Sequence, residues 1–240
     1  MLLVRFLFLF IFTSNIFALA ELNPNSIYHF FNNNFLLSGT STLTTNYVWR
    51  GLSRTNDHPA AQAGVTLSHI NGIYSGVWGS NVFFANLELN YFAGYKHTYK
   101  DLVYDLNFTR FNFNNNRLRN LNYNQFSGSL AYNWVHGGIS YAPKAFHTSS
   151  HNLYYTAGVS LPIPDYHSMI LRNLSLNADL GYSQFEDGSL DRFDYVNYKL
   201  AINKKINKFN FNLALTDTNH KFHLRKIDHR KIFASIKADF

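Results

Sequence analysis

Cysteine is absent from this 240-residue chain, which excludes disulfide bridges and thiolate zinc sites. Charge is also scarce, because Asp, Glu, Lys and Arg make up 15% of the residues, against about a quarter in an average soluble domain. Beyond the first 20 residues no run of about 20 apolar residues occurs, so a transmembrane helix is excluded. A closed, hydrogen-bonded β-barrel satisfies all three conditions, and a soluble exported β-sandwich is also compatible with them.

Residues 1–20 have the features of a secretory signal peptide. Arg5 provides a positive charge, residues 6–12 are almost purely apolar, and the segment ends with Ala-Leu-Ala. We expect cleavage before Glu21. The alternative is an uncleaved membrane anchor, for which the apolar stretch is short. Cleavage removes one Arg and no acidic residue, so the formal charge of +7 falls by one and the mature chain stays basic.

Apolar and polar side chains alternate along much of the remaining chain. In the last ten residues, 231–240, every second position is Ile, Ala or Phe. A period of two predicts extended strands with two different faces. About twelve strands are predicted, approximately at residues 37–49, 62–70, 73–84, 86–97, 101–112, 123–133, 135–142, 153–162, 172–183, 194–204, 208–217 and 231–240. The apolar face would point into the core of a sandwich, whereas it would point to lipid in a membrane barrel.

The connections between these strands alternate in length. Those after odd-numbered strands are mostly long, such as 50–61 and 218–230, and those after even-numbered strands are mostly short, such as 71–72. Long loops on one side and short turns on the other are typical of outer-membrane barrels. The sequence therefore predicts an all-β fold, an antiparallel transmembrane β-barrel of about 12 strands. It forms a single domain over residues 21–240, with a loose lead-in at 21–36.

Four stretches of sequence form a pattern more specific than alternation. They read NYVWRGLS (46–53), PAAQAG (59–64), GIYSGVWGSNV (72–82) and LELNYFAGY (87–95). This pattern resembles the TorF family of predicted bacterial porins, strongly over residues 45–95 and more weakly toward the C-terminus. The chain departs from the family at Asn46, where Asp is usual, and at Ala63, where Gly is usual. The resemblance implies an outer-membrane barrel with a transport role, and it implies no particular substrate and no catalytic residues.

Arg50 and Gly51 fall where the first predicted strand meets the outer rim. Glycine accepts the positive φ of a turn, and Pro59 stiffens the far end of the same loop. Two interpretations of Arg50 are open. It forms an ion pair at the rim, for example with Asp57, or it attracts anionic solutes.

Charged residues on the polar faces of the predicted strands are candidates for lining a lumen. They are Glu88, Lys96, Asp105, Asp179 and Lys199, together with Arg50 at the rim. Their mixed signs predict weak selectivity, and the net positive charge of the chain favours anions.

A basic run lies in the last long loop, before the final strand. Lys221, Arg225 and Lys226 belong to it, and Asp228 is the one acidic residue between 221 and 231. In an exported protein we discount nucleic-acid binding and expect this loop to contact the phosphates of lipopolysaccharide.

Neither a metal centre nor a catalytic group is predicted. The clustered histidines, which are His147 and His151 and then His220, His223 and His229, fall in predicted loops where solvated side chains are the default. Ser68 and His69 are adjacent, so their side chains point to opposite faces of a strand and do not suit a Ser–His pair. We therefore expect no cofactor and no metal.

The sequence as a whole predicts a porin-like channel of the bacterial outer membrane rather than an enzyme. It would let small hydrophilic solutes pass passively, with a preference for anions, and its other partners would be outer-membrane lipid and lipopolysaccharide. The alternatives are a structural barrel without a conducting pore and a lipid-modifying barrel enzyme. The identity of the solute, the openness of the lumen and the oligomeric state stay open at this point.

Overall fold

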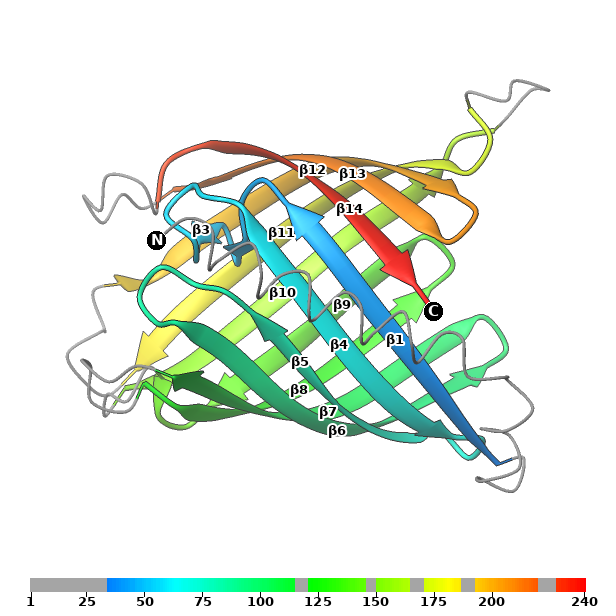
Figure 1. Ribbon diagram of the computed structural model, residues 1–240, viewed down its shortest axis with the longest axis horizontal. Helices are drawn as coiled ribbons and strands as arrows, with labels where there is room; N and C mark the ends of the chain where they lie inside the picture. Colours follow the sequence, from blue (N-terminus) through cyan, green and yellow to red (C-terminus); the bar gives the residue numbers. More distant parts are fainter. Residues whose placement is uncertain (1–33, 115–120, 146–149, 165–170, 187–192, 220–227) are drawn as a thin grey trace, which may run out of the picture.

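The computed structural model describes residues 34–114, 121–145, 150–164, 171–186, 193–219 and 228–240. Within these residues, twelve antiparallel strands close into one barrel and two short strands pair separately (Figure 1). The barrel strands are β1 (Phe35–Thr44), β4 (Ala60–His69), β5 (Ile73–Ser80), β6 (Leu87–Tyr99), β7 (Leu102–Asn114), β8 (Tyr123–Tyr132), β9 (Val135–Ala142), β10 (His151–Pro162), β11 (Leu174–Glu186), β12 (Tyr195–Ile206), β13 (Phe209–Thr218) and β14 (Lys231–Asp239). The separate pair is β2 (Val48–Trp49) and β3 (Leu52–Ser53). The predicted fold class is confirmed.

Each barrel strand pairs with its neighbours in sequence, and β1 closes the barrel against β14. Thr42 of β1 lies opposite Lys237 of β14 on one side and Gln62 of β4 on the other. The first predicted strand, 37–49, is too long, because β1 ends at Thr44 where the chain leaves the wall. No helix among the described residues is long and apolar enough to cross a membrane. The predicted signal peptide at 1–20 lies outside the described residues.

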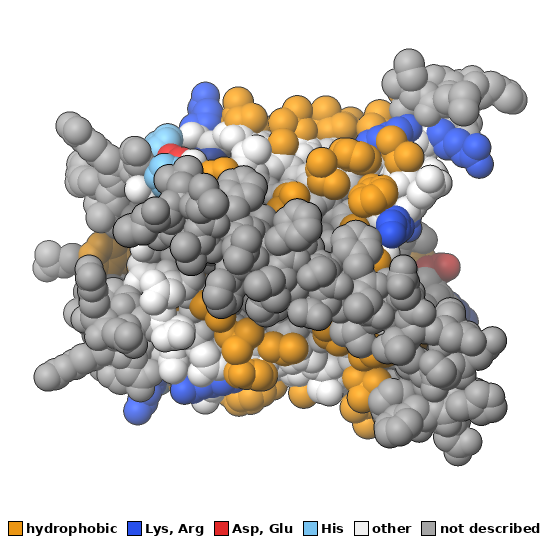
Figure 2. All heavy atoms as spheres, in the orientation of Figure 1, with side chains coloured by type: hydrophobic (Ala, Val, Ile, Leu, Met, Phe, Trp, Pro, Cys, Tyr) orange, Lys and Arg blue, Asp and Glu red, His pale blue; other side chains and the backbone are white. Residues whose placement is uncertain are grey.

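The apolar faces of the strands point outward. Leu106, Leu180 and Leu200, each near the middle of its strand, have 61%, 59% and 59% of their surface exposed. Figure 2 shows hydrophobic side chains along the flank of the barrel and Lys and Arg mainly toward its two ends. A water-soluble sandwich would bury these leucines, because each costs about 1.5–3 kcal/mol to expose. The arrangement is that of a membrane barrel, in which lipid covers them.

Exposed aromatic side chains form two belts around the barrel. Toward the end with the long loops they are Tyr91, Phe126, Tyr141, Tyr155, Tyr182 and Tyr198. Toward the end with the short turns they are Phe35, Tyr99, Tyr132, Trp134, Phe209 and Phe240. Aromatic girdles at both membrane–water interfaces are a property of outer-membrane barrels, so the two belts mark the edges of the apolar band.

The inner faces of the strands are polar. In the half nearer the short turns, Asn177 donates to Ser160 Oγ at 2.8 Å, Asn203 donates to Asn177 Oδ1 at 2.8 Å, and Asn212 donates to Asn203 Oδ1 at 2.6 Å. All four side chains are half-buried rather than sealed from solvent. This half of the barrel therefore has a hydrogen-bonded, water-accessible lumen.

Candidate functional site

A hairpin occupies the inside of the barrel at the end with the long loops. Residues 45–59 leave the wall after β1, and within them β2 pairs with β3 so that Trp49 faces Leu52. The two residues between these strands, Arg50 and Gly51, have φ values of 51° and 79°. Two consecutive positive φ angles define the type I′ turn that suits a two-residue hairpin, and glycine is the residue that adopts it most readily.

The tip of the hairpin reaches the wall opposite its origin. In the strand order, β9 lies across the barrel from β1, and Arg50 contacts both neighbours of β9. Its Nη1 donates to Asn152 Oδ1 of β10, and its Nη2 donates to Gln125 Oε1 of β8, each at 2.8 Å. A Cβ on Gly51 would lie 2.7 Å from side-chain carbons of Asn197 and Thr218, so the turn also presses against β12 and β13.

Stacked side chains run across the lumen from β6 to β10. Glu88 of β6 forms an ion pair with Arg54 at 3.2 Å. The guanidinium groups of Arg54 and Arg50 each lie 4.1 Å from the Trp49 ring centroid. The guanidinium of Arg50 also lies 4.0 Å from the ring of Tyr154 on β10. Each such cation–π contact contributes about 0.5–2 kcal/mol, depending on how dry it is.

The two arginines differ in how their charge is balanced. Arg54 faces Glu88, which is completely buried and also accepts from Asn90 at 2.9 Å. Burial alone would lower the pKa of Arg54, but the carboxylate of Glu88 and the hydroxyls of Tyr123 and Tyr47 together outweigh burial, and the pKa lies above its ordinary value. Arg50 has only amide oxygens as acceptors and no carboxylate partner among the described residues. Burial lowers the pKa of Arg50, yet an arginine stays protonated at neutral pH, so this charge is uncompensated.

The returning part of the segment is tied to β14. Lys231, whose side chain is 1% exposed, lies 2.9 Å from Asp57, and His229 lies 3.5 Å from the same carboxylate. Asn46 donates to Asp57 at 2.8 Å and accepts from Ser53 at 2.6 Å. The proposed rim pair of Arg50 with Asp57 is therefore wrong, because Arg50 lies inside the barrel and Asp57 pairs with β14.

A continuous layer around the lumen is closed to solvent at the level of the hairpin. Every one of the twelve strands contributes an inward-facing residue with less than 10% of its surface exposed. They are Thr44, Ala60, Ser80, Glu88, Phe113, Tyr123, Ala142, Asn152, Ser183, Tyr195, Thr216 and Lys231. Apolar residues of the wall pack there against Tyr47 and Leu52 of the hairpin segment. We call this cross-section the packed layer.

The remaining predicted lumen residues form two pairs below the packed layer. Asp179 and Lys199 are register partners on β11 and β12, 3.8 Å apart, and His136 contacts Asp179 at 2.8 Å across β10. Lys96 and Asp105 are register partners on β6 and β7. Asp105 accepts a hydrogen bond of 2.6 Å from Tyr74.

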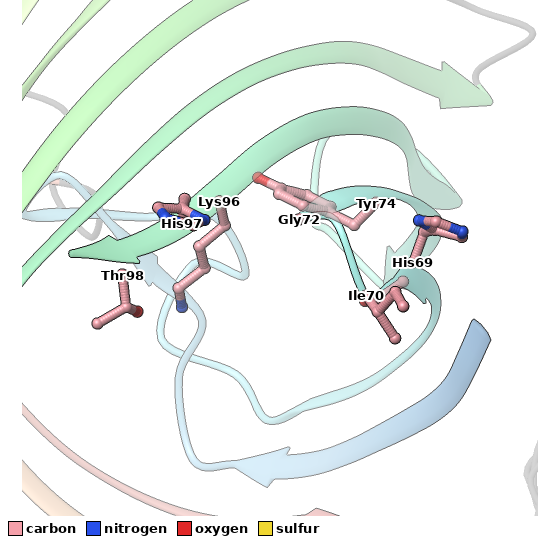
Figure 3. A pocket seen from close by; sticks show the side chains of 8 residues that line it. His69, Ile70, Gly72, Tyr74, Lys96, His97 and Thr98 are labelled. Atoms are coloured by element: carbon pink, nitrogen blue, oxygen red, sulfur yellow. The ribbon is translucent and has the colours of Figure 1, made fainter. Parts of the chain in front are cut away.

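A pocket of about 360 Å³ lies at the opposite end of the barrel from the packed layer. Figure 3 shows its labelled residues, which come from the end of β4, the turn that follows it, the start of β5 and the end of β6. Ser68 and His69 line it together with Lys96 and His97. It is separate from the hairpin and lies at the short-turn end of the barrel.

The predicted basic run and most of the clustered histidines are not among the residues that the structure describes. Lys221, Arg225 and Lys226 lie outside the described residues, as do His147, His220 and His223. His151 contacts the hydroxyl of Tyr141 at 2.9 Å. Within the described part of the chain, no group of three His, Asp or Glu residues is placed to hold a metal ion.

Sequence reasoning missed most of the packed layer. Arg54, Trp49, Gln125, Asn152 and Tyr154 were not singled out. The one local signal was a glycine in Arg-Gly, between Val-Trp and Leu-Ser, because glycine favours the positive φ of a two-residue hairpin turn. Nothing local indicates that this hairpin points inward, because that depends on partners from β6, β8 and β10.

The fold and the polar lumen together define a porin-like β-barrel. The chain belongs to the family described as "Bacterial protein of unknown function (Gcw_chp)", whose family model matches residues 32–239. Among solved structures, the KdgM porin matches with a TM-score of 0.52 at 8% identity, over 85% of this chain and 99% of that chain. The NanC porin matches with a TM-score of 0.53 at 6% identity, over 85% of this chain and 99% of that chain. A search of curated proteins gives no significant match.

Proposed function

We propose that this protein is a channel of the bacterial outer membrane through which small hydrophilic solutes pass passively. The observation that carries the proposal is the combination of an apolar outer band between two aromatic belts with a polar, water-accessible lumen. The first requires lipid, and the second offers a path for polar molecules. The relation to the TorF family is part of the proposal and is supported by the motifs at 46–53 and 59–64. So is export by the cleaved signal peptide at 1–20.

A preference for anions is the finer part of the proposal. Arg50 projects into the lumen with a charge that no carboxylate of the described residues balances, whereas Arg54 is neutralised by Glu88. Lower in the lumen, Lys199 and Asp179 offset each other. The uncompensated charge of Arg50 attracts anions and repels cations.

The packed layer favours a second candidate, a structural barrel that does not conduct. Planar-bilayer recording with the refolded chain separates the two candidates. Discrete, reproducible current steps support the channel. A correctly folded protein that produces no steps at any applied voltage supports the structural barrel.

Contact of Lys221, Arg225 and Lys226 with lipopolysaccharide is proposed for the last long loop on charge alone. Neutralising the three residues to Gln should reduce the lipopolysaccharide that copurifies in detergent. Equal amounts of lipopolysaccharide copurifying with this variant and with the parent chain would refute that part of the proposal. Hydrolysis of phospholipid by the purified barrel, in turn, would point to the lipid-modifying enzyme instead.

A further inference from the structure

The hairpin segment 45–59 is fastened to the wall without being part of it. Its strands β2 and β3 pair with each other in a sheet of their own, and neither pairs with a barrel strand in the described chain. Two backbone hydrogen bonds hold it, from Phe83 N–H to Arg54 O and from Thr45 N–H to Ala234 O, each at 2.9 Å. Side chains make the other attachments, with Arg54 bound to Glu88, Arg50 to Gln125 and Asn152, and Asp57 to Lys231. A segment attached in this way can detach without breaking the hydrogen-bonded barrel.

The segment also closes a lumen that is otherwise accessible to water. Inward-facing polar residues below the hairpin, such as Asn177 and Lys199, are half-buried, whereas wall residues at its level, such as Glu88 and Ser183, are buried. Arg50 at the tip of the hairpin is itself half-buried. A cross-section packed in this way hinders hydrated solutes, because they would have to shed water and displace side chains to pass. A channel with this cross-section needs a way to clear it.

Of these attachments, the ion pair between Arg54 and Glu88 is the one whose loss would most destabilise the docked position of the hairpin. Glu88 is fully buried, and Arg54 is 5% exposed at its side chain. If the carboxylate became a neutral amide, the guanidinium would keep its charge in a dry layer with no counter-charge. It can regain hydration only by moving out of the layer, and it carries the hairpin with it.

We propose that segment 45–59 is a gate that leaves the packed layer as a unit, and that Glu88 is the residue that holds it closed. The proposal rests on the channel function for its consequence, since an open gate matters only if solutes then pass. Because the segment is tethered at both ends to β1 and β4, the displaced hairpin stays at the long-loop mouth with Arg50 and Arg54 on it.

The absence of cysteine allows a direct test of gate movement. Ser53 of β3 is 2% exposed, so Ser53→Cys introduces one thiol that is shielded while the hairpin is docked. The rate of its reaction with a small water-soluble thiosulfonate is measured in proteoliposomes. We expect the rate to rise at least tenfold when Glu88→Gln is added. Asp105→Asn, the same acid-to-amide change in the lumen away from the hairpin, should leave the rate unchanged.

A second variant tests the gate if Glu88→Gln does not fold. Gly51→Ala introduces a Cβ that overlaps Asn197 and Thr218 and disfavours the positive φ, so it expels the hairpin without changing charge. Gly128→Ala is its control, because the nearest atom there is 3.4 Å away in ordinary contact. Barrel formation is checked for every variant by its heat-dependent mobility in gels. If neither Glu88→Gln nor Gly51→Ala accelerates labelling in a folded barrel, the gate is refuted.

Current recordings on the same variants keep the two proposals apart. Faster labelling together with more frequent or larger current steps supports both the gate and the channel. Faster labelling without any current supports the gate and contradicts the channel. Current steps with unchanged labelling support the channel and contradict the gate.

Discussion

Removal of the Arg50 charge should reduce anion selectivity by a predictable amount. An ion in the passage about 8 Å from the guanidinium interacts with it by roughly 0.5 kcal/mol at a dielectric constant of about 80, and by roughly 2 kcal/mol at about 20. The charge attracts an anion and repels a cation by this same amount, so the two energies add in the permeability ratio. The Arg50→Gln variant should therefore lower the anion-to-cation permeability ratio roughly fivefold at the higher dielectric constant and up to roughly nine-hundredfold at the lower one. Salt screening, with a Debye length of about 8 Å at physiological ionic strength, moves the effect toward the lower figure.

The assay is the reversal potential of single channels in a potassium chloride gradient. Arg50→Lys keeps the charge and should keep the preference for anions. Lys208→Gln removes the same charge in the short turn between β12 and β13, where Lys208 lies over Phe209 and Phe240, and should leave the ratio within about twofold. An unchanged reversal potential for Arg50→Gln, with both controls as expected, would refute the role of Arg50 in selectivity.

Two further predictions concern the stability of the barrel. Leu200→Lys places a charge in the middle of the lipid face and should destabilise the barrel by about 2–4 kcal/mol. Asn203→Lys places the charge on the lumen side of the same strand and should destabilise the barrel much less. Equal unfolding midpoints of the two variants in urea with lipid vesicles would contradict the assigned faces. Gly158→Ala introduces a Cβ against Asp179 Oδ1 and 2.5 Å from His136 Nε2, which should break their contact and cost about 1–3 kcal/mol. A variant as stable as the parent chain would show that β10 adjusts there without strain.

Much of the barrel could be predicted from the sequence because its physical cause is local. Two strands were predicted at 172–183 and 194–204 from an alternation that repeats every two residues, and the structure has β11 at Leu174–Glu186 and β12 at Tyr195–Ile206. Long and short connections distinguished the two ends. The alternation and the connection lengths both follow from the geometry of tilted strands in a bilayer, so each strand can be recognised from its own residues.

The hairpin could not be predicted in the same way, because its position depends on distant partners. Residues 46–49 continue the polar and apolar pattern of β1, so the first strand was extended to 49, although the chain leaves the wall after Thr44. Because that strand was taken to end at 49, Arg50 was placed where it would meet the rim. The carboxylate of Glu88 and the amides of Gln125 and Asn152, from three other strands, help to make an inward position stable for the two arginines.

The missed residues share one property that explains why they were missed. Gln125, Asn152 and Tyr154 look like ordinary polar positions of alternating strands, and their importance comes from what they face across the barrel. Asn152 also donates to Ser183 at 2.9 Å, which fixes the amide so that its oxygen points to Arg50. Networks of this kind join residues far apart in sequence, and a single sequence carries no record of them.

The measurement that tests the account most directly is the labelling of neighbouring cysteines on one strand in a lipid bilayer. Asp179→Cys and Leu180→Cys place single thiols on opposite faces of β11, one toward the lumen and one on the surface that is 59% exposed. In proteoliposomes a small water-soluble thiosulfonate should modify Asp179→Cys readily and leave Leu180→Cys protected by lipid until detergent is added. Rapid modification of Leu180→Cys in intact vesicles, with Asp179→Cys protected, would show that the polar face is not the water-filled one.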